Sequence, residues 1–222
     1  FELVSTNRNE VKRFYTQNDN FYLAKKIFSR EFKKDEAVKL LNILEIGQDI
    51  EVDTVEGEFK KVILTQNNGK KFDISDLGHG ISQLIPIIID PDSFDPIYGF
   101  KRPKFWMISE PEANLHPKLQ SKLANLFVHK TKDTYSRFLI ESHSEYLIRN
   151  LQYLVAKGDL DKENVQLYYF YEPGQLHDGE DVVKKININE DGSLTDDFGS
   201  GFFDESDKIA LSLFFLNQSQ KN

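Results

Sequence analysis

The chain has 222 residues, of which 39% are hydrophobic and 13% aromatic, and this composition excludes a disordered protein. It contains no cysteine, which excludes disulfides and thiolate metal sites and indicates a reducing compartment such as the cytoplasm. With 28 basic and 36 acidic residues the formal charge is −8, which does not favour a polyanion as partner, and no apolar stretch is long enough to span a membrane.

The first 75 residues carry two different periodicities. Apolar residues within 1–45 recur at helical spacing, as at Leu40, Leu41 and Leu44, which predicts a helical segment. From residue 46 the period shifts toward two, and a turn sequence at 66–69 separates two alternating runs. This pattern predicts a small antiparallel meander over residues 46–75. We therefore expect a helical segment at 1–45, followed by a second region at 46–222.

The rest of the chain alternates between strand and helix patterns. Helices are predicted near 81–89, 117–129 and 144–156, and strands at 104–109, 136–141 and 165–171. A last strand at 182–188 and an apolar helix at 208–216 close the chain. Such alternation is typical of βαβ units, so the expected fold class is α/β, with a mostly parallel sheet flanked by helices.

A glycine-rich turn precedes the apolar run that begins at Ile81. Gly78 and Gly80 allow close approach of the backbone, and the N–H groups at the start of a helix attract anions. Ser82 adds a hydroxyl donor. The three residues are candidates for binding a phosphate, although a turn of this kind is also an ordinary connector.

An acidic residue ends the strand predicted at 104–109. Glu110 follows the apolar run directly, and Pro111 prevents further strand pairing. Nucleotide hydrolysis needs a carboxylate near Mg²⁺ and a group that orients or deprotonates water, and Glu110 stands where such a group belongs. The alternative is that Glu110 and Glu112 only favour the start of the next helix.

The strand predicted at 136–141 also ends in polar residues. His143 follows it and could donate a hydrogen bond to a terminal phosphate. Ser142 and Glu145 alternatively form a capping box, which requires no catalysis. A Ser–His hydrolase is disfavoured because the Gly-x-Ser-x-Gly elbow is missing from the sequence. Metal binding by histidines lacks any ligand spacing; the residues considered are His79, His116, His143 and His177.

A second acidic group lies in the segment after the run at 81–89. Asp90 and Asp92, with Asp95 beyond them, could chelate Mg²⁺ in a nuclease. Segments rich in aspartate and proline are more often turns. The nuclease stays open as a less favoured alternative.

Taken together, these motifs resemble the ABC-type ATPases of the OLD, RecF and SMC group, and most closely the compact prokaryotic AAA family ATPases often encoded in anti-phage defence loci. The resemblance covers roughly residues 70–205. Residues 76–83 correspond to the family's signature segment, and 108–112 to the end of the Walker B strand. Residues 112–117 resemble the stretch that carries the D-loop. The resemblance implies that Glu110 is the catalytic glutamate and a metal ligand, and that His143 is the switch histidine.

The sequence departs from this pattern in three places. It has no Gly-x-x-x-x-Gly-Lys-[Ser/Thr] phosphate loop, so the chain alone is expected to bind ATP poorly. Ser109 stands where the metal-binding acid is usual, and Gly78 stands near the usual signature serine. The chain begins at Phe1 and its only methionine is Met107, so we expect a fragment or processed form whose phosphate loop lies elsewhere.

The resemblance implies ATP and Mg²⁺ as cofactors and a homodimer that sandwiches ATP head to tail, with Gly78, Gly80 and Ser82 of one copy facing the γ-phosphate of the other. Such a dimer would drive a partner, for example a nuclease or DNA, in anti-phage defence. The alternative from another class is a degenerate interaction module that keeps the fold and has lost hydrolysis. The sequence alone leaves both open.

Overall fold

The computed structural model describes residues 2–5, 11–19, 22–28, 32–90, 94–95, 100–101, 104–134, 136–171, 181–199 and 201–219. The chain divides into two compact units, residues 1–147 and 148–222. The segment 1–45, expected to be helical, belongs to the first unit. Among the described helices, none combines the length and apolar content that crossing a bilayer requires.

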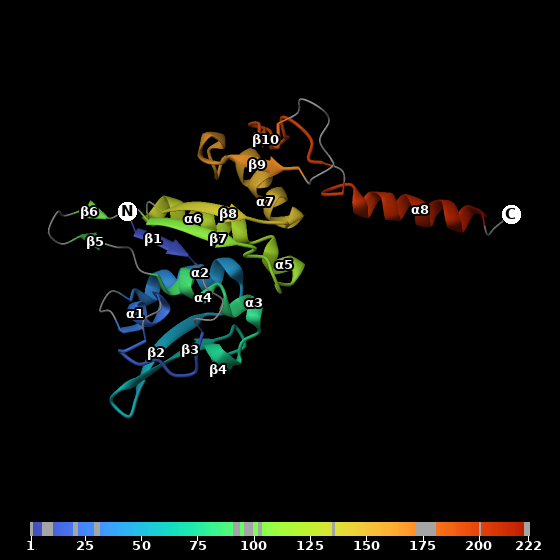
Figure 1. Ribbon diagram of the computed structural model, residues 1–222. Helices are drawn as coiled ribbons and strands as arrows, with labels where there is room; N and C mark the ends of the chain where they lie inside the picture. The colour runs from blue at the N-terminus through green and yellow to red at the C-terminus, as the bar shows by residue number, and fades with distance from the viewer. Residues whose placement is uncertain are drawn as a thin grey trace. The chain divides into compact units, whose positions relative to one another are not determined.

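The first unit contains a parallel sheet. Its strands are β1 (Glu2–Ser5), β7 (Lys104–Ser109) and β8 (Arg137–Glu141), in the order β1-β7-β8 (Figure 1). Trp106 in β7 is fully buried and stacks on its register partner Phe138 in β8, with ring centroids 6.2 Å apart. The expected α/β class with a parallel sheet is confirmed.

Strand β1 lies in the segment that was predicted to be helical. It pairs with β7, so that Leu3 lies opposite Phe105, about a hundred residues away in sequence. Four residues are too few to reveal a period, and the partner strand that holds them extended is distant. The helical prediction for residues 2–5 is therefore wrong, because a non-local pairing decides their conformation.

Helices of this unit pack against one another. They are α1 (Tyr22–Phe28), α2 (Lys34–Leu44), α4 (Ile85–Ile89) and α6 (Leu123–Thr134), and α2 packs against α4, α6 and strand β2 (Asp49–Val55). The helix expected at 81–89 is split into α3 (His79–Ser82) and α4, where Pro86 occupies the first turn of α4. Proline lacks an N–H donor and is tolerated only in the first turn of a helix. The helix expected at 117–129 is likewise divided into α5 (Pro117–Gln120) and α6.

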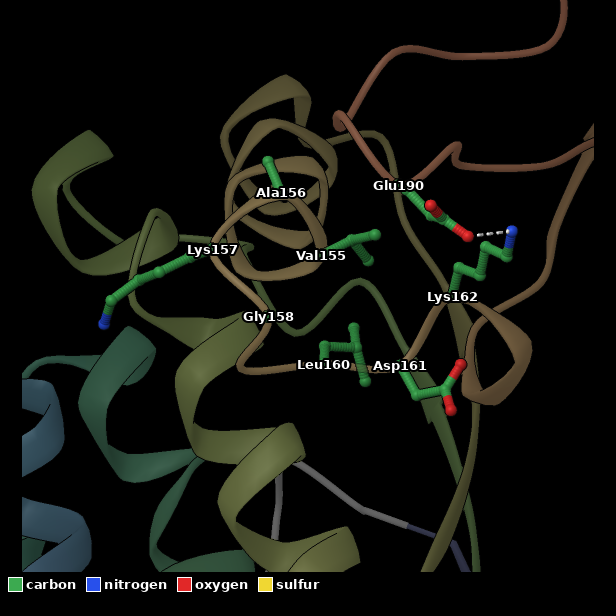
Figure 2. A pocket seen from close by; sticks show the side chains of 8 residues that line it. All are labelled: Val155, Ala156, Lys157, Gly158, Leu160, Asp161, Lys162 and Glu190. Atoms are coloured by element: carbon green, nitrogen blue, oxygen red, sulfur yellow. Dashed lines mark hydrogen bonds and ion pairs between the residues drawn. The ribbon is translucent and has the colours of Figure 1, made fainter.

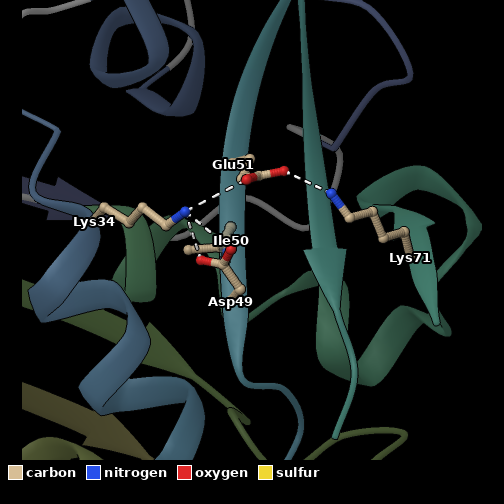
Figure 3. A network of polar contacts seen from close by, with 5 residues as sticks. All are labelled: Lys34, Asp49, Ile50, Glu51 and Lys71. Atoms are coloured by element: carbon tan, nitrogen blue, oxygen red, sulfur yellow. Dashed lines mark hydrogen bonds and ion pairs between the residues drawn. The ribbon is translucent and has the colours of Figure 1, made fainter. Parts of the chain in front are cut away.

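The antiparallel meander expected at 46–75 is confirmed. It consists of β2 (Asp49–Val55), β3 (Phe59–Thr65) and β4 (Lys71–Asp73). On its surface the Lys34 ammonium lies 2.8 Å from Asp49 and 3.5 Å from Glu51, and Lys71 lies 3.0 Å from Glu51 (Figure 3). Hydrogen bonds from these lysines lower the pKa of both carboxyls. A further antiparallel pair, β5 (Phe94–Asp95) with β6 (Phe100–Lys101), precedes β7.

The pKa of Glu45 provides a test of a second pair of surface contacts between lysines and a carboxylate. Hydrogen bonds from Lys118 at 2.8 Å and Lys122 at 2.7 Å lower the pKa of the Glu45 carboxyl from 4.5 to about 2. Because folding lowers this pKa, the pairing stabilises the fold above pH 4.5, and the contribution is lost as the pH falls from 4.5 toward 2. Replacing both lysines by methionine is expected to return the Glu45 pKa toward 4.5 in a carboxyl ¹³C NMR titration. An unchanged titration in that variant would contradict the assignment.

The second unit contains most of α7 (Glu145–Ala156) and an antiparallel pair, β9 (Leu167–Phe170) with β10 (Val183–Ile186). An aromatic cluster connects β9 with the segment after β10: Tyr169 of β9 contacts Phe198 and Phe202. The Arg149 guanidinium lies 4.3 Å from the centre of the Phe203 ring. Helix α8 (Glu205–Ser219) ends the described chain, with apolar side chains exposed. The strand predicted at 165–171, the last strand and the terminal helix are confirmed, with shifted bounds.

Candidate functional site

The loops after β7 and β8 meet at the carboxyl edge of the parallel sheet. Ser109 and Glu141 are the last residues of these strands and are register partners. The Ser109 hydroxyl donates to Glu141 Oε2 at 2.8 Å, and the Glu110 N–H donates to the Glu141 carbonyl at 2.8 Å. In open α/β sheets this edge is where ligands bind.

Glu110 and His143, the two predicted catalytic residues, lie side by side at this edge. Glu110 Oε1 is 3.9 Å from His143 Nε2, and their side chains are 45% and 74% exposed. The distance exceeds that of a hydrogen bond, and polar groups at such a spacing commonly share a water molecule or a ligand oxygen. The predicted convergence of the two loops is therefore present in the structure.

The turn that follows Glu110 has an unusual backbone. Glu110 and Asn114 have φ angles of 47° and 61°, in the left-handed region that residues other than glycine rarely adopt. The Ala113 N–H donates to the Glu110 carbonyl, and the Leu115 N–H donates to the Glu112 carbonyl. Strained residues of this kind concentrate at functional sites.

The glycine-rich segment packs directly on this turn. A Cβ at Gly80 would lie 2.4 Å from the Asn114 carbonyl oxygen, so only glycine permits this close approach. The Gln83 side chain donates to the carbonyls of Pro111 at 2.7 Å and Ala113 at 2.9 Å. The segment around α3 and the turn after β7 thus form one packed unit.

The predicted ligand residues of this segment differ in their surroundings. Gly78 precedes α3 and is exposed, and a Cβ there would meet no atom within 4 Å. Ser82 is buried, with its hydroxyl 3.3 Å from the carbonyl oxygens of Ile74, Leu77 and Gly78. The phosphate-binding roles of Gly78, Gly80 and Ser82 remain predictions.

Sequence reasoning missed three side chains of this site: Gln83, Glu141 and the buried Glu112. A signal existed for Gln83 and for Glu141. Gln83 is a polar residue inside an apolar run, and a buried amide requires partners. Ser109 and Glu141 are the last residues of two strands that were both predicted, so pairing them in parallel would have brought their side chains together.

Asp90 does not fit the nuclease alternative. Its carboxylate is buried, and both of its oxygens accept hydrogen bonds from the Lys104 ammonium at 2.6 Å. A buried carboxylate held in this way by a lysine is a structural ion pair and lacks the solvent access that an exchangeable metal ligand needs. Asp92 lies outside the described residues. The use of Asp90 as a nuclease ligand is therefore wrong.

Two of the other histidines, His116 and His129, have local contacts. His116 caps α5, where its Nδ1 accepts from the Lys118 N–H, and His129 Nε2 lies 3.0 Å from Glu36. His177 lies outside the described residues. No group of three or more histidine, aspartate or glutamate side chains that could hold a metal ion occurs in the described part of the chain.

Two open cavities occur in the described part of the chain, one in each unit. One, of about 340 Å³, is in the second unit (Figure 2); its lining residues are Val155, Ala156, Lys157, Gly158, Leu160, Asp161, Lys162 and Glu190. The other, of about 390 Å³, is lined by Glu45, Ile46, Gln66, Asn67, Asn68 and Ile81. Neither contains Glu110 or His143, so the convergence of loops, and not a cavity, defines the candidate site.

Residues 3–148 match the family model described as AAA ATPase domain. The chain belongs to the AAA ATPase domain family. This family covers the parallel sheet, the glycine-rich segment and both loops that carry Glu110 and His143, and it confirms the resemblance to P-loop ATPases inferred from the motifs. The match supports ATPase as the activity class of this domain.

Residues 160–213 match a second model, described as a protein of unknown function (DUF3696). No curated protein matches the chain. Among solved structures, the chain is similar to one from a study of ATP-driven dimerization and DNA-stimulated activation of SMC ATPases. The two are 13% identical with a TM-score of 0.46, and the similarity covers 72% of this chain and 84% of that one.

Two SMC head structures show weaker similarity. The head domain from Pyrococcus furiosus, bound to the C-terminal domain of ScpA, is 12% identical with a TM-score of 0.39, and the match covers 53% of this chain and 29% of that one. The head domain from Thermotoga maritima is 11% identical with a TM-score of 0.38, and the match covers 67% of this chain and 46% of that one. The chain thus spans less than half of either protein.

Proposed function

We propose that this ATPase domain hydrolyses ATP in a head-to-tail dimer. The segment 76–83 of one copy contacts the γ-phosphate of an ATP molecule held by the other copy, where Glu110 and His143 act on the attacking water. One observation carries the proposal: Glu110 and His143, from loops 33 residues apart, lie 3.9 Å apart at the carboxyl edge of a parallel sheet.

The two side chains supply complementary chemistry. The water oxygen forms a bond to the γ-phosphorus, the bond from phosphorus to the bridging oxygen breaks, and ADP and phosphate leave. The Glu110 carboxylate orients the water and accepts its proton, and the His143 ring donates a hydrogen bond to a γ-phosphate oxygen. The exposure of both side chains leaves them accessible to a nucleotide.

The donor set at this edge fits Mg²⁺. Ser109, Glu110 and Glu141 present a hydroxyl and two carboxylates, which are oxygen ligands of the kind that Mg²⁺ prefers. Nucleotide-bound Mg²⁺ needs only one or two protein carboxylates, because water and phosphate oxygens complete its shell. When bound, the ion would neutralise charge on the phosphate oxygens. Glu141 then stands in for the acid that Ser109 replaces.

The phosphate loop is supplied by another segment in this proposal. The sequence contains no such loop, and one face of the sheet is open: Met107 and Leu139, which are register partners on β7 and β8, are 43% and 55% exposed. Parallel sheets are normally covered on both faces. The same face ends in Ser109 and Glu141, so an element that covered it would bring its loop to the candidate site.

The partner is proposed from the family resemblance. ATP-driven closure and release of the dimer would drive a nuclease or DNA in anti-phage defence, in the cytoplasm. The net charge of −8 favours a protein partner over direct contact with DNA. The second candidate function is a degenerate interaction module without hydrolysis. It is favoured by the absence of a phosphate loop from the sequence and by Ser109, because a hydroxyl cannot replace a carboxylate as an anionic ligand.

A mixing experiment tests the shared site. Gly78→Arg should fold, because Gly78 is exposed and a Cβ there would meet no atom within 4 Å, and it should block the phosphate of the opposite copy. Glu110→Gln should disable the other half of the site. In a head-to-tail dimer of one Gly78→Arg chain and one Glu110→Gln chain, both defects fall in one site and the second site is intact.

A one-to-one mixture of the two inactive variants is therefore expected to regain ATP turnover that neither variant has alone. Half of the dimers are mixed and each has one intact site, so independent sites would give about a quarter of wild-type turnover, and coupled sites would give less. The measurement uses the intact protein that includes the phosphate loop. If both variants fold and their mixture stays inactive, the two copies do not share a site. If the wild type binds ATP without turnover, the interaction module is the correct function.

A further inference from the structure

The Glu112 carboxylate links the two catalytic loops. Its side chain is 8% exposed, and Oε1 accepts the backbone N–H of His143 at 2.6 Å. The second oxygen, Oε2, is buried and has no hydrogen-bond partner among the described residues. Nothing in a cap or a turn requires a carboxylate there, so the bond to the His143 backbone is the contact that explains its burial.

We propose that Glu112 is a positioning residue, which holds His143 at the distance from Glu110 that lets both act on one ATP molecule. The inference rests on the proposed function, because it assigns Glu112 a role through His143. Glu112 itself is buried and does not touch the nucleotide in this scheme.

The backbone of Glu112 is firmly held. Gln83 donates to the carbonyls of Pro111 and Ala113, the residues on either side of Glu112. The left-handed conformations of Glu110 and Asn114 close the turn around it. A carboxylate on such a rigid base can fix the position of a neighbouring loop, since a hydrogen bond to a charged acceptor is stronger than one between neutral groups.

The His143 loop needs this anchor. Residues 142–144 form no helix or strand. Two serines hold the end of this loop, where α7 begins: Ser144 N–H donates to Ser142 Oγ at 3.1 Å, and Ser144 Oγ donates to Gln120 at 2.8 Å. The backbone of His143 is held by Glu112, which comes from the same turn as Glu110.

The test uses Glu112→Leu, which keeps the size of the side chain and removes the acceptor, and Glu112→Gln, which keeps a carbonyl acceptor. In the intact protein, Glu112→Leu is expected to lower kcat by about 10- to 100-fold with little change in ATP affinity, because misplacement of a catalytic group by about 1 Å has effects of this size. Glu112→Gln is expected to recover most of the lost turnover.

Two readouts separate positioning from general stability. Hydrogen exchange of the His143 amide should accelerate in Glu112→Leu and stay slow in Glu112→Gln. In a double-mutant cycle, Glu112→Leu/His143→Ala should turn over ATP no more slowly than His143→Ala alone, because Glu112 acts through that ring. Losses that multiply in the double variant would overturn the proposal.

The outcomes distinguish this inference from the proposed function. If His143→Ala has wild-type turnover, the assigned role of His143 fails, and the role of Glu112 fails with it. If His143→Ala is impaired and the losses multiply, only the inference about Glu112 fails. Should Glu112→Leu not fold, Glu112→Asp gives the same cycle, since its carboxylate is one methylene too short to reach the His143 amide.

Discussion

Replacement of Glu110 by glutamine is expected to slow ATP turnover of the intact protein by about 10²- to 10⁴-fold, the range that loss of a general base produces. Glutamine keeps the size of the side chain and its hydrogen-bonding carbonyl, but it cannot accept the proton of the attacking water. ATP binding needs no such proton transfer, so nucleotide affinity should remain. The variant is therefore expected to accumulate as an ATP-bound dimer.

The measurement combines steady-state phosphate release with light scattering in the presence of ATP. Glu163→Gln is the matched control, because Glu163 is an exposed carboxylate on a short 3₁₀ turn of the second unit. It should leave both measurements at wild-type values. If Glu110→Gln also leaves turnover and ATP-dependent dimerisation unchanged, Glu110 has no catalytic role.

Replacement of Lys104 by methionine is expected to lower the free energy of unfolding by about 3 kcal/mol, at the lower end of the range for removing one partner of a buried ion pair. Lys104 and Asp90 are 2% and 3% exposed, and the variant leaves the Asp90 carboxylate buried without its 2.6 Å partner. Lys26, 3.9 Å from Asp90, compensates only in part. Urea denaturation measures the loss.

The double variant Asp90→Asn/Lys104→Met provides the control. It removes both charges, and replacement of a buried ion pair by neutral groups is often close to neutral for stability. Most of the lost stability should therefore return in the double variant. A single variant as stable as the wild type would show that the ion pair contributes nothing to folding.

Local patterns in the sequence were sufficient to predict the two strands that precede Glu110 and His143. The strand predicted at 104–109 is β7, because its apolar run ends at Ser109 and Pro111 prevents further pairing. The strand before His143 was placed within one residue by the same argument. Since parallel strands end at a common edge, the meeting of Glu110 and His143 followed from these two predictions.

Contacts between residues that are far apart in the sequence could not be predicted in this way. Gln83 donates to carbonyls 28 and 30 residues further along the chain, and every residue carries such an acceptor, so the sequence holds no sign of the partner. Strand β1 is four residues long and depends on β7 for its conformation. Asp90 looked like a metal ligand because its lysine partner lies 14 residues away.

The hydrogen bonds from Gln83 to the turn after β7 have a consequence for the order of hydrolysis at the two sites. In the proposed head-to-tail dimer, the segment 76–83, which ends in Gln83, faces one nucleotide, whereas the turn that Gln83 holds serves the opposite nucleotide. Binding of ATP at one site would then affect the other site through the hydrogen bonds of the Gln83 amide. The two hydrolysis events of such a dimer would therefore not be independent, and Gln83 could set the order in which the two ATP molecules are hydrolysed.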